Sequence, residues 1–114
     1  MNQQTLPNFQ ESEAFAVLRF VESHTSQKSL AQDIGYSVGK VNYILKALVQ
    51  KGFVKYENFS KNPDKKQYSY LLTKHGLEEK LNLTEKFVKR KKKEYEELQY
   101  ELEMMKSYKK TTDE

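Results

Sequence analysis

The sequence predicts a mainly α-helical protein with one small β-hairpin and a long C-terminal helix. Apolar residues recur at helical spacing before Gly52 and again after Leu77, which indicates several helices. Residues 53–58 and 67–72 are instead rich in aromatic and β-branched or apolar residues and flank a basic loop, which is typical of a hairpin. At 114 residues, with 32% of them charged, the chain can form one small core and one exposed, charge-rich helix.

Two helices are expected in the first third of the chain. The first should run from about Phe9 to Ser23, because Asn8 and Glu11 have the spacing of a capping box and apolar residues then repeat at helical intervals. The second is short, begins after a cap at Ser26 and ends near Ile34.

The stretch from Gln27 to Lys46 has the features of two short helices that cross at a steep angle. Ala31 is small where the second helix would lie against the first, and Gly35 tolerates the positive φ that a sharp reversal favours. Ser37 can cap the next helix and aim its free N–H groups at a phosphate. That helix should end at Gly52. Its inward stripe is Val41, Ile44, Leu45 and Leu48. The pattern predicts a helix-turn-helix, with an ordinary helical hairpin as the alternative.

The outward face of this third helix is suited to a nucleic acid. The inward stripe leaves Gly39, Tyr43 and Lys46 outside, with Lys40 and Asn42 on the flanks and no acidic residue among them. Asn42 could pair bidentately with adenine, Lys46 could contact guanine or phosphate, and Tyr43 could reach a phosphate or a thymine methyl. A solvated helix surface is the alternative interpretation for each residue.

The middle of the chain is basic. From Lys28 to Lys66 there are eight lysines and three acidic residues, an excess of five, whereas from Lys74 onward eleven basic and ten acidic residues nearly cancel. Such an excess suits a polyanionic partner, since neutralising phosphates releases counterions. Lysine-rich faces also serve solubility, so charge alone leaves both interpretations open.

The final helix carries a heptad pattern. Thr73 can cap it, and it continues without Pro or Gly from Leu77 to about Tyr108. It is about 50 Å long at ~1.5 Å per residue, too long for so small a domain to cover, although its first two turns could fold back on that domain. The pattern therefore predicts a two-stranded coiled coil, with antiparallel chains favoured. Its seam is Leu77, Leu81, Thr84, Val88, Lys91, Tyr95, Leu98, Leu102 and Met105.

The sequence offers no candidate for catalysis, a cofactor or a metal. It has no cysteine, which excludes disulfides, thiolate catalysis and cysteine-ligated zinc. His24 and His75 each stand alone near a helix boundary, without a carboxylate or histidine at metal-ligand spacing, so both are interpreted as surface residues. No apolar run is long enough to span a membrane, and MNQQTLPNFQ lacks a secretory signal, so we expect a cytoplasmic protein. Because the sequence offers no catalytic candidate, we also expect that the protein is not an enzyme.

The segment SLAQDIGYSVGKVNYILKALVQKGFVKYENF, followed by a basic loop and YLLTKHG, resembles the winged helix-turn-helix of MarR-type bacterial regulators. More narrowly, it resembles the short MarR-family regulators found with exopolysaccharide (EPS) gene clusters. The resemblance covers residues 10–108, and SVGKVNY is its most specific part. It implies a dimeric repressor or activator whose third helix enters the major groove, while the hairpin, or wing, touches backbone or minor groove.

The sequence departs from the MarR pattern in two ways. MarR wings typically carry an Asp–Arg pair that sends arginine into the minor groove, but this loop offers Asp64, Lys65 and Lys66, so we expect phosphate contact instead. The N-terminal extension that helps to enclose an effector pocket in larger MarR proteins is missing, so no drug-like pocket is expected. The sequence does not indicate whether any small-molecule effector binds.

Together these observations predict an N-terminal arm at residues 1–8, a winged helix-turn-helix at 9–73 and a dimerisation helix at 74–110. The expected function is a homodimeric, sequence-specific transcriptional regulator that binds double-stranded DNA. The alternative is a winged-helix module that binds protein, with the coiled coil as a scaffold. The expected DNA contacts are Ser37, Gly39, Lys40, Asn42, Tyr43 and Lys46 from the third helix and Lys61, Lys65 and Lys66 from the wing. The expected dimer contacts are Leu77, Leu81, Val88, Tyr95, Leu98 and Leu102.

Overall fold

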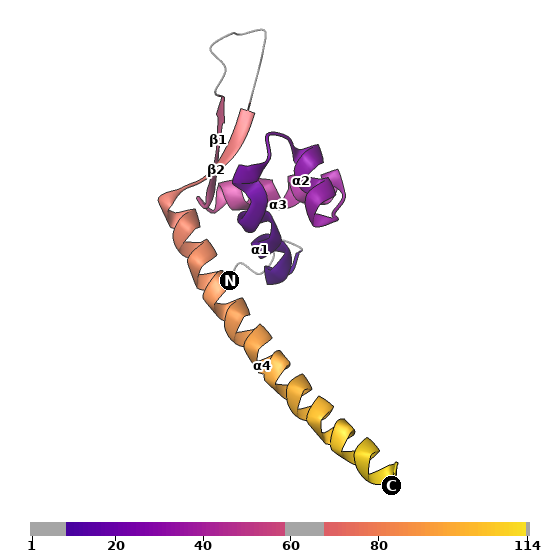
Figure 1. The fold of residues 1–114 in the computed structure, drawn as a ribbon. Coiled ribbons are helices and arrows are strands. Elements are labelled where there is room, and N and C mark those ends of the chain that lie inside the picture. Colours follow the sequence, from indigo (N-terminus) through magenta and orange to yellow (C-terminus); the bar gives the residue numbers. More distant parts are fainter. Residues whose placement is uncertain (1–8, 59–67, 114) are drawn as a thin grey trace. The chain divides into compact units, whose positions relative to one another are not determined.

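The computed structural model describes residues 9–58 and 68–113 (Figure 1). Its elements are α1 (Glu11–Phe20), the short 3-10 helix η2 (Val21–Ser23), α2 (Gln27–Ile34), α3 (Val38–Gln50), β1 (Val54–Asn58), β2 (Tyr68–Leu72) and α4 (Lys74–Thr112). The predicted fold class is confirmed. The chain forms two compact units, Met1–Leu81 and Asn82–Glu114. Within the described ranges, no helix has an apolar stretch long and uninterrupted enough to cross a membrane.

The start and end of the first helix differ from the prediction. The capping box is formed by Gln10 and Glu13 rather than by Asn8 and Glu11, and the Gln10 backbone N–H donates to Glu13 Oε1 at 2.9 Å. The helix therefore begins at Glu11. Its C-terminal part tightens into the separate 3-10 turn η2, a common ending for an α-helix.

The turn between α2 and α3 forms as predicted. Ser26 caps α2 by accepting from the Ser29 N–H at 3.1 Å, and Gly35 ends it with φ of 80°. Ser37 then caps α3, since its Oγ accepts from the Lys40 N–H at 3.1 Å. Gly52, also at φ of 80°, follows the end of α3.

The core of the first unit is built mainly from α1, α2 and α3. The predicted stripe of α3 is at most 2% exposed, and Ala31 is also buried, as its small side chain allows where α2 packs on α3. Apolar burial of this kind is the main favourable term for so small a domain. The buried apolar side chains of this unit are Val17, Leu18, Val21, Leu30, Ala31, Val41, Ile44, Leu45, Leu48 and Val54.

The two strands form an antiparallel hairpin. Val54 pairs with Leu72 and Tyr56 pairs with Tyr70, so the alternation of a strand places these two pairs on the same face. Val54 is buried. Farther along the hairpin, the Tyr56 and Tyr70 rings face each other with their centroids 4.7 Å apart. The predicted wing lysines, Lys61, Lys65 and Lys66, lie outside the described residues.

The helix α4 is held to the first unit at its N-terminus. Thr73 caps it as predicted, accepting from the Gly76 N–H at 2.9 Å. Gly76 is buried against Phe53, and a Cβ at this position would overlap the Phe53 carbonyl. Leu77 and Leu81 remain about 60% exposed, so the winged helix-turn-helix does not cover the first two turns of the predicted seam.

In the second unit, α4 continues as one helix; Leu83 is buried, and from Val88 onward the large apolar side chains are exposed. Lys91 approaches Glu94 Oε1 at 3.7 Å, a solvent-exposed pair on the same helix. The exposed apolar residues here include Val88, Tyr95, Leu98, Leu102, Met104, Met105 and Tyr108. Side chains of this size at heptad spacing leave an apolar stripe without a cover in the single chain.

Candidate nucleic-acid interface

The outer surface of α3 presents two of the predicted contact residues to solvent. Tyr43 is 47% exposed, and its ring meets the Phe9 ring edge-on with centroids 5.9 Å apart. Lys46 is exposed and forms no ion pair with a described residue. An unpaired ammonium on a rigid helix can contact a phosphate or a guanine edge without first breaking a bond within the protein.

Lys40 is positioned by two other groups. Its ammonium forms an ion pair with the carboxylate of Glu13 on α1 and lies 4.7 Å from the centroid of the Tyr36 ring. The hydrogen bond from Lys40, followed by the backbone N–H of Gln10, lowers the pKa of Glu13. The face of α3 carries no acid of its own, as predicted, but α1 places one beside it.

Asn42 belongs to a polar cluster that joins three elements. Gln27 Nε2, at the start of α2, donates to Asn42 Oδ1 at 3.3 Å and to the Tyr70 hydroxyl of β2 at 3.0 Å. All three side chains are half-buried. The bidentate adenine contact expected from the sequence needs the Asn42 carbonyl. The carbonyl oxygen has two lone pairs and can accept from Gln27 and from a base at once, so this contact stays a prediction.

An open groove lies between the C-terminal half of α3 and the hairpin. It measures about 310 Å³ and is lined by Lys46, Val49, Gln50, Tyr56 and Tyr70. The tyrosine pair therefore extends the hairpin's inward face past the core and borders the same outer surface that carries Lys46. Aromatic and basic side chains together suit the apolar and phosphate parts of a nucleic acid.

Gly39 and Ser37 complete the N-terminal end of this surface. Both are exposed, and a Cβ added at Gly39 would meet nothing within 4 Å. Packing among the described residues therefore does not require glycine at this position. Glycine is unfavourable within a helix, so the presence of glycine at position 39 needs a reason other than packing against the described residues.

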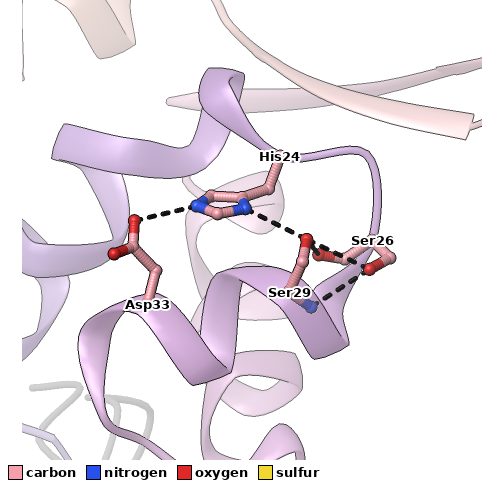
Figure 2. Close-up of polar contacts among 4 residues, drawn as sticks. All are labelled: His24, Ser26, Ser29 and Asp33. Atoms are coloured by element: carbon pink, nitrogen blue, oxygen red, sulfur yellow. Dashed lines mark hydrogen bonds and ion pairs between the residues drawn. The ribbon is translucent and has the colours of Figure 1, made fainter.

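The interpretation of His24 as an isolated surface residue is wrong. Figure 2 shows its ring between two side chains of α2: Nε2 lies 2.9 Å from Asp33 Oδ2, and Nδ1 lies 3.0 Å from Ser29 Oγ. Ser26 Oγ in turn contacts Ser29 Oγ at 3.2 Å. The ring is mostly buried, with a side chain 18% exposed, and fastens the turn before α2 to both ends of that helix. Sequence spacing did not reveal this contact, because Asp33 is nine residues away.

His75 does lie at the surface, as predicted. Its side chain is 67% exposed, with Nδ1 3.6 Å from Glu78 Oε1 and the ring 4.9 Å from that of Phe53. Among the residues that the structure describes, no group of three histidine or acidic side chains could hold a metal ion.

Comparison with known proteins identifies the motif and the fold. Residues 21–55 match the family of winged helix-turn-helix DNA-binding domains. The structure of Staphylococcus aureus MepR bound to ethidium bromide has a TM-score of 0.54 at 18% identity, over 94% of this chain and 81% of that one. The zinc-dependent MarR family transcriptional regulator AdcR, in its Zn(II)-bound state, has a TM-score of 0.46 at 19% identity, over 79% of this chain and 68% of that one. No curated protein sequence matches the chain.

The chain therefore contains a winged helix-turn-helix, and its fold is similar to that of MepR. The family that matches residues 21–55 is a class of DNA-binding domains and not of enzymes, which agrees with the prediction of a non-enzyme. The structure brings five predicted residues onto or beside one surface: Ser37, Gly39, Asn42, Tyr43 and Lys46. Three residues that also shape this surface were missed from the sequence, namely Glu13, Gln27 and Tyr70.

Proposed function

We propose that the chain is a homodimeric transcriptional regulator that recognises a specific sequence in double-stranded DNA. The observation that carries the proposal is the orientation of α3. Its apolar stripe is almost wholly buried, while Tyr43 and Lys46 project from the opposite side of the same rigid helix. In a helix-turn-helix this is the helix that enters the major groove. Since its ligand would be chromosomal DNA, we expect the protein in the cytoplasm.

The proposed contacts divide into two kinds. Asn42 and Tyr43 touch bases, whereas Lys46 and the wing lysines Lys65 and Lys66 contact phosphates. A base contact carries sequence information, and a phosphate contact adds affinity for every sequence. Asn42→Ala should therefore cost about 1–3 kcal/mol on the specific site alone. The double variant Lys65→Ala, Lys66→Ala should weaken binding to all sequences and reduce the salt slope by roughly one to two.

Selection from a random duplex library tests the proposal, followed by mobility-shift titrations of the selected duplex and a scrambled one. We expect moderate salt to abolish binding to the scrambled duplex first. Lys46→Ala should lower the salt slope by about one, and Lys109→Ala, the same change near the end of α4, should not alter it. Failure to select any sequence would instead favour the protein-binding winged helix, and mapping bound sites in the genome would test the EPS genes as targets.

The dimer is proposed on the exposed apolar stripe of α4, with residues 9–73 as the DNA-binding part and 74–110 as the dimerisation helix. Lys91 occupies a seam position, where a buried ammonium is costly unless its head reaches water. Lys91→Leu should raise the melting temperature of the dimer. Lys93→Leu, two residues along and off the seam, should leave the melting temperature unchanged. Equal responses of the two variants would show that the seam lies elsewhere.

A further inference from the structure

We propose that the middle of α4 is a second DNA-binding surface, one that contacts the phosphate backbone of a duplex without reading its sequence. This surface is the basic block, defined as residues 86–93, and it lies wholly within the second unit of the chain. The inference deepens the proposed function, since it rests on the homodimer and on DNA as its ligand. It adds a contact outside the winged helix-turn-helix.

The charges of α4 are separated along its length. In the basic block, six of the eight residues are basic and none is acidic, whereas the next ten residues, 94–103, include five glutamates and no basic residue. The near balance of charge after Lys74 thus combines two blocks of opposite sign. A short run so rich in lysine and arginine is typical of a nucleic-acid-binding patch. The basic residues of the block are Lys86, Lys89, Arg90, Lys91, Lys92 and Lys93.

The charge of the block is only partly compensated within the chain. All six basic side chains are exposed, and Lys89, Lys92 and Lys93 form no ion pair with a described residue. Lys91 alone approaches the Glu94 carboxylate, at 3.7 Å. Like charges three and four residues apart repel each other, so the block does not stabilise the helix that carries it. Its ammonium groups are available to an anion from outside the chain.

Dimerisation brings two copies of the block together, whichever way the helices run. The block is centred between Lys89 and Arg90, which is also the centre of the proposed antiparallel pair. In a parallel pair in register, each block lies beside its own copy. A dimer therefore gathers twelve basic side chains, six from each chain, over ~12 Å of coil at ~1.5 Å per residue. Its positive potential is stronger than that of a single chain.

The charge density of the paired blocks favours duplex DNA as the ligand. The pair carries roughly one positive charge per 1 Å of coil. A duplex carries one negative charge per about 1.7 Å of its axis, whereas an extended acidic peptide carries at most one per about 3.3 Å. The duplex therefore comes closer to neutralising the block, and the counterions that it releases favour binding. Lysine also suits a phosphate, which it contacts as a point charge.

Substitution of three lysines that lie outside the seam tests the inference. The Gln variant removes their charges and keeps good helix formers, so it should fold and dimerise; its changes are Lys89→Gln, Lys92→Gln and Lys93→Gln. The Arg variant keeps the charges, with arginine at the same three positions. A control variant removes the same number of charges from the end of α4, outside the block, by Lys106→Gln, Lys109→Gln and Lys110→Gln.

The measurement is an anisotropy titration of the full chain with the selected duplex and with a scrambled one, at several salt concentrations. A dimer of the Gln variant lacks three charges per chain, and about half of these can face one duplex. The salt slope should therefore fall by about three on both duplexes, and affinity for the scrambled duplex should fall by about tenfold or more at low salt. The Arg variant and the control variant should keep the slope of the unsubstituted chain.

Two outcomes would overturn the inference while a selected sequence leaves the proposed function intact. One is an unchanged salt slope in the Gln variant; if that variant also lost binding to polyglutamate, the block would be assigned to an acidic protein. The other is an equal fall in the Gln and control variants, which would show an effect of overall charge alone. Conversely, a lower slope in the Gln variant of a chain that selects no sequence would support the block and reject the proposed function.

Discussion

The ammonium group of Lys40 on α3 forms an ion pair with the carboxylate of Glu13 on α1. Lys40 is predicted to contact DNA, but its positive charge is balanced by Glu13 within the protein. Lys46 on the same helix has no ion-pair partner among the described residues. The two lysines should therefore contribute unequally to DNA binding. Lys40 must give up or share its carboxylate partner before its charge can neutralise a phosphate.

Removing the charge of Glu13 should strengthen DNA binding. Glu13→Gln frees Lys40 and removes a negative charge beside the proposed interface, so affinity for every duplex should rise and the salt slope should steepen by up to about one. Fluorescence anisotropy titrations at several salt concentrations measure both quantities. Glu85→Gln removes the same charge from an exposed site on α4 and should have little effect. An unchanged slope in Glu13→Gln would show that Lys40 lies away from the phosphates.

The same pair predicts a loss of stability in acid. The Lys40 hydrogen bond, and then the Gln10 backbone N–H, hold the pKa of Glu13 below its ordinary value of 4.5 in the folded state. The folded protein therefore favours the carboxylate. The stabilisation is complete above the unfolded pKa and is lost as the pH falls through the lower folded pKa.

Thermal unfolding of the chain and of Glu13→Gln, from about pH 6 to about pH 3, tests this sign. The unsubstituted chain should melt higher near neutral pH, and its advantage should shrink below the ordinary pKa of the glutamate. An advantage that stays constant with pH would mean that the Glu13 carboxylate is not responsible.

The sequence was sufficient to predict the fold, because the fold depends on short-range patterns. The stripe of α3, the caps Ser26 and Ser37 and the turn at Gly35 all follow from spacing within one or two turns of chain. The first capping box was assigned two residues too early, since Asn8–Glu11 and Gln10–Glu13 have the same spacing and only the folded chain distinguishes them.

The site was harder to predict, because its decisive contacts join distant segments. Asp33 reaches His24 across nine residues, Glu13 reaches Lys40 across 27, and Tyr70 reaches Gln27 across 43. A helical projection of α3 shows which residues face outward, but not which neighbours occupy their polar atoms. The need for glycine at position 76 likewise comes from the approach of Phe53, which no local pattern reveals.

Glycine at position 39 is expected to lower the stability of the folded chain and to raise its affinity for DNA. Because a Cβ there meets nothing within 4 Å in the part of the chain that the structure describes, Gly39→Ala should stabilise the folded chain by about 0.5–1 kcal/mol. If the proposed interface is right, the added methyl group occupies space that the DNA backbone needs, and affinity for the selected duplex should fall. Urea unfolding measures the first effect and mobility shift the second. A more stable variant with unchanged affinity would place Gly39 outside the interface.

The direction of the proposed coiled coil follows from the position of one lysine. In a parallel pair Lys91 faces its own copy, and the basic run 89–93 lies beside itself. An antiparallel pair centred between Lys89 and Arg90 instead packs the Lys91 stem on Val88. It also forms two leucine layers, Leu77 with Leu102 and Leu81 with Leu98. All four leucines are exposed in the single chain and so are available to a partner. Exposed flanking ion pairs contribute only a few tenths of a kcal/mol each, so we expect the seam to determine the direction and predict antiparallel chains.

A spin label measures this direction, since the chain has no native cysteine. In antiparallel chains, labels on Ser107→Cys lie ~50 Å apart along the axis at ~1.5 Å per residue, whereas in parallel chains they lie side by side. Labels on Lys92→Cys, close to the proposed centre, should lie within about 20 Å in either arrangement and so report that the dimer has formed. A short distance at position 92 with a long one at 107 supports the antiparallel seam. Short distances at both, below about 25 Å, would show that the helices run parallel and that Lys91 faces its own copy.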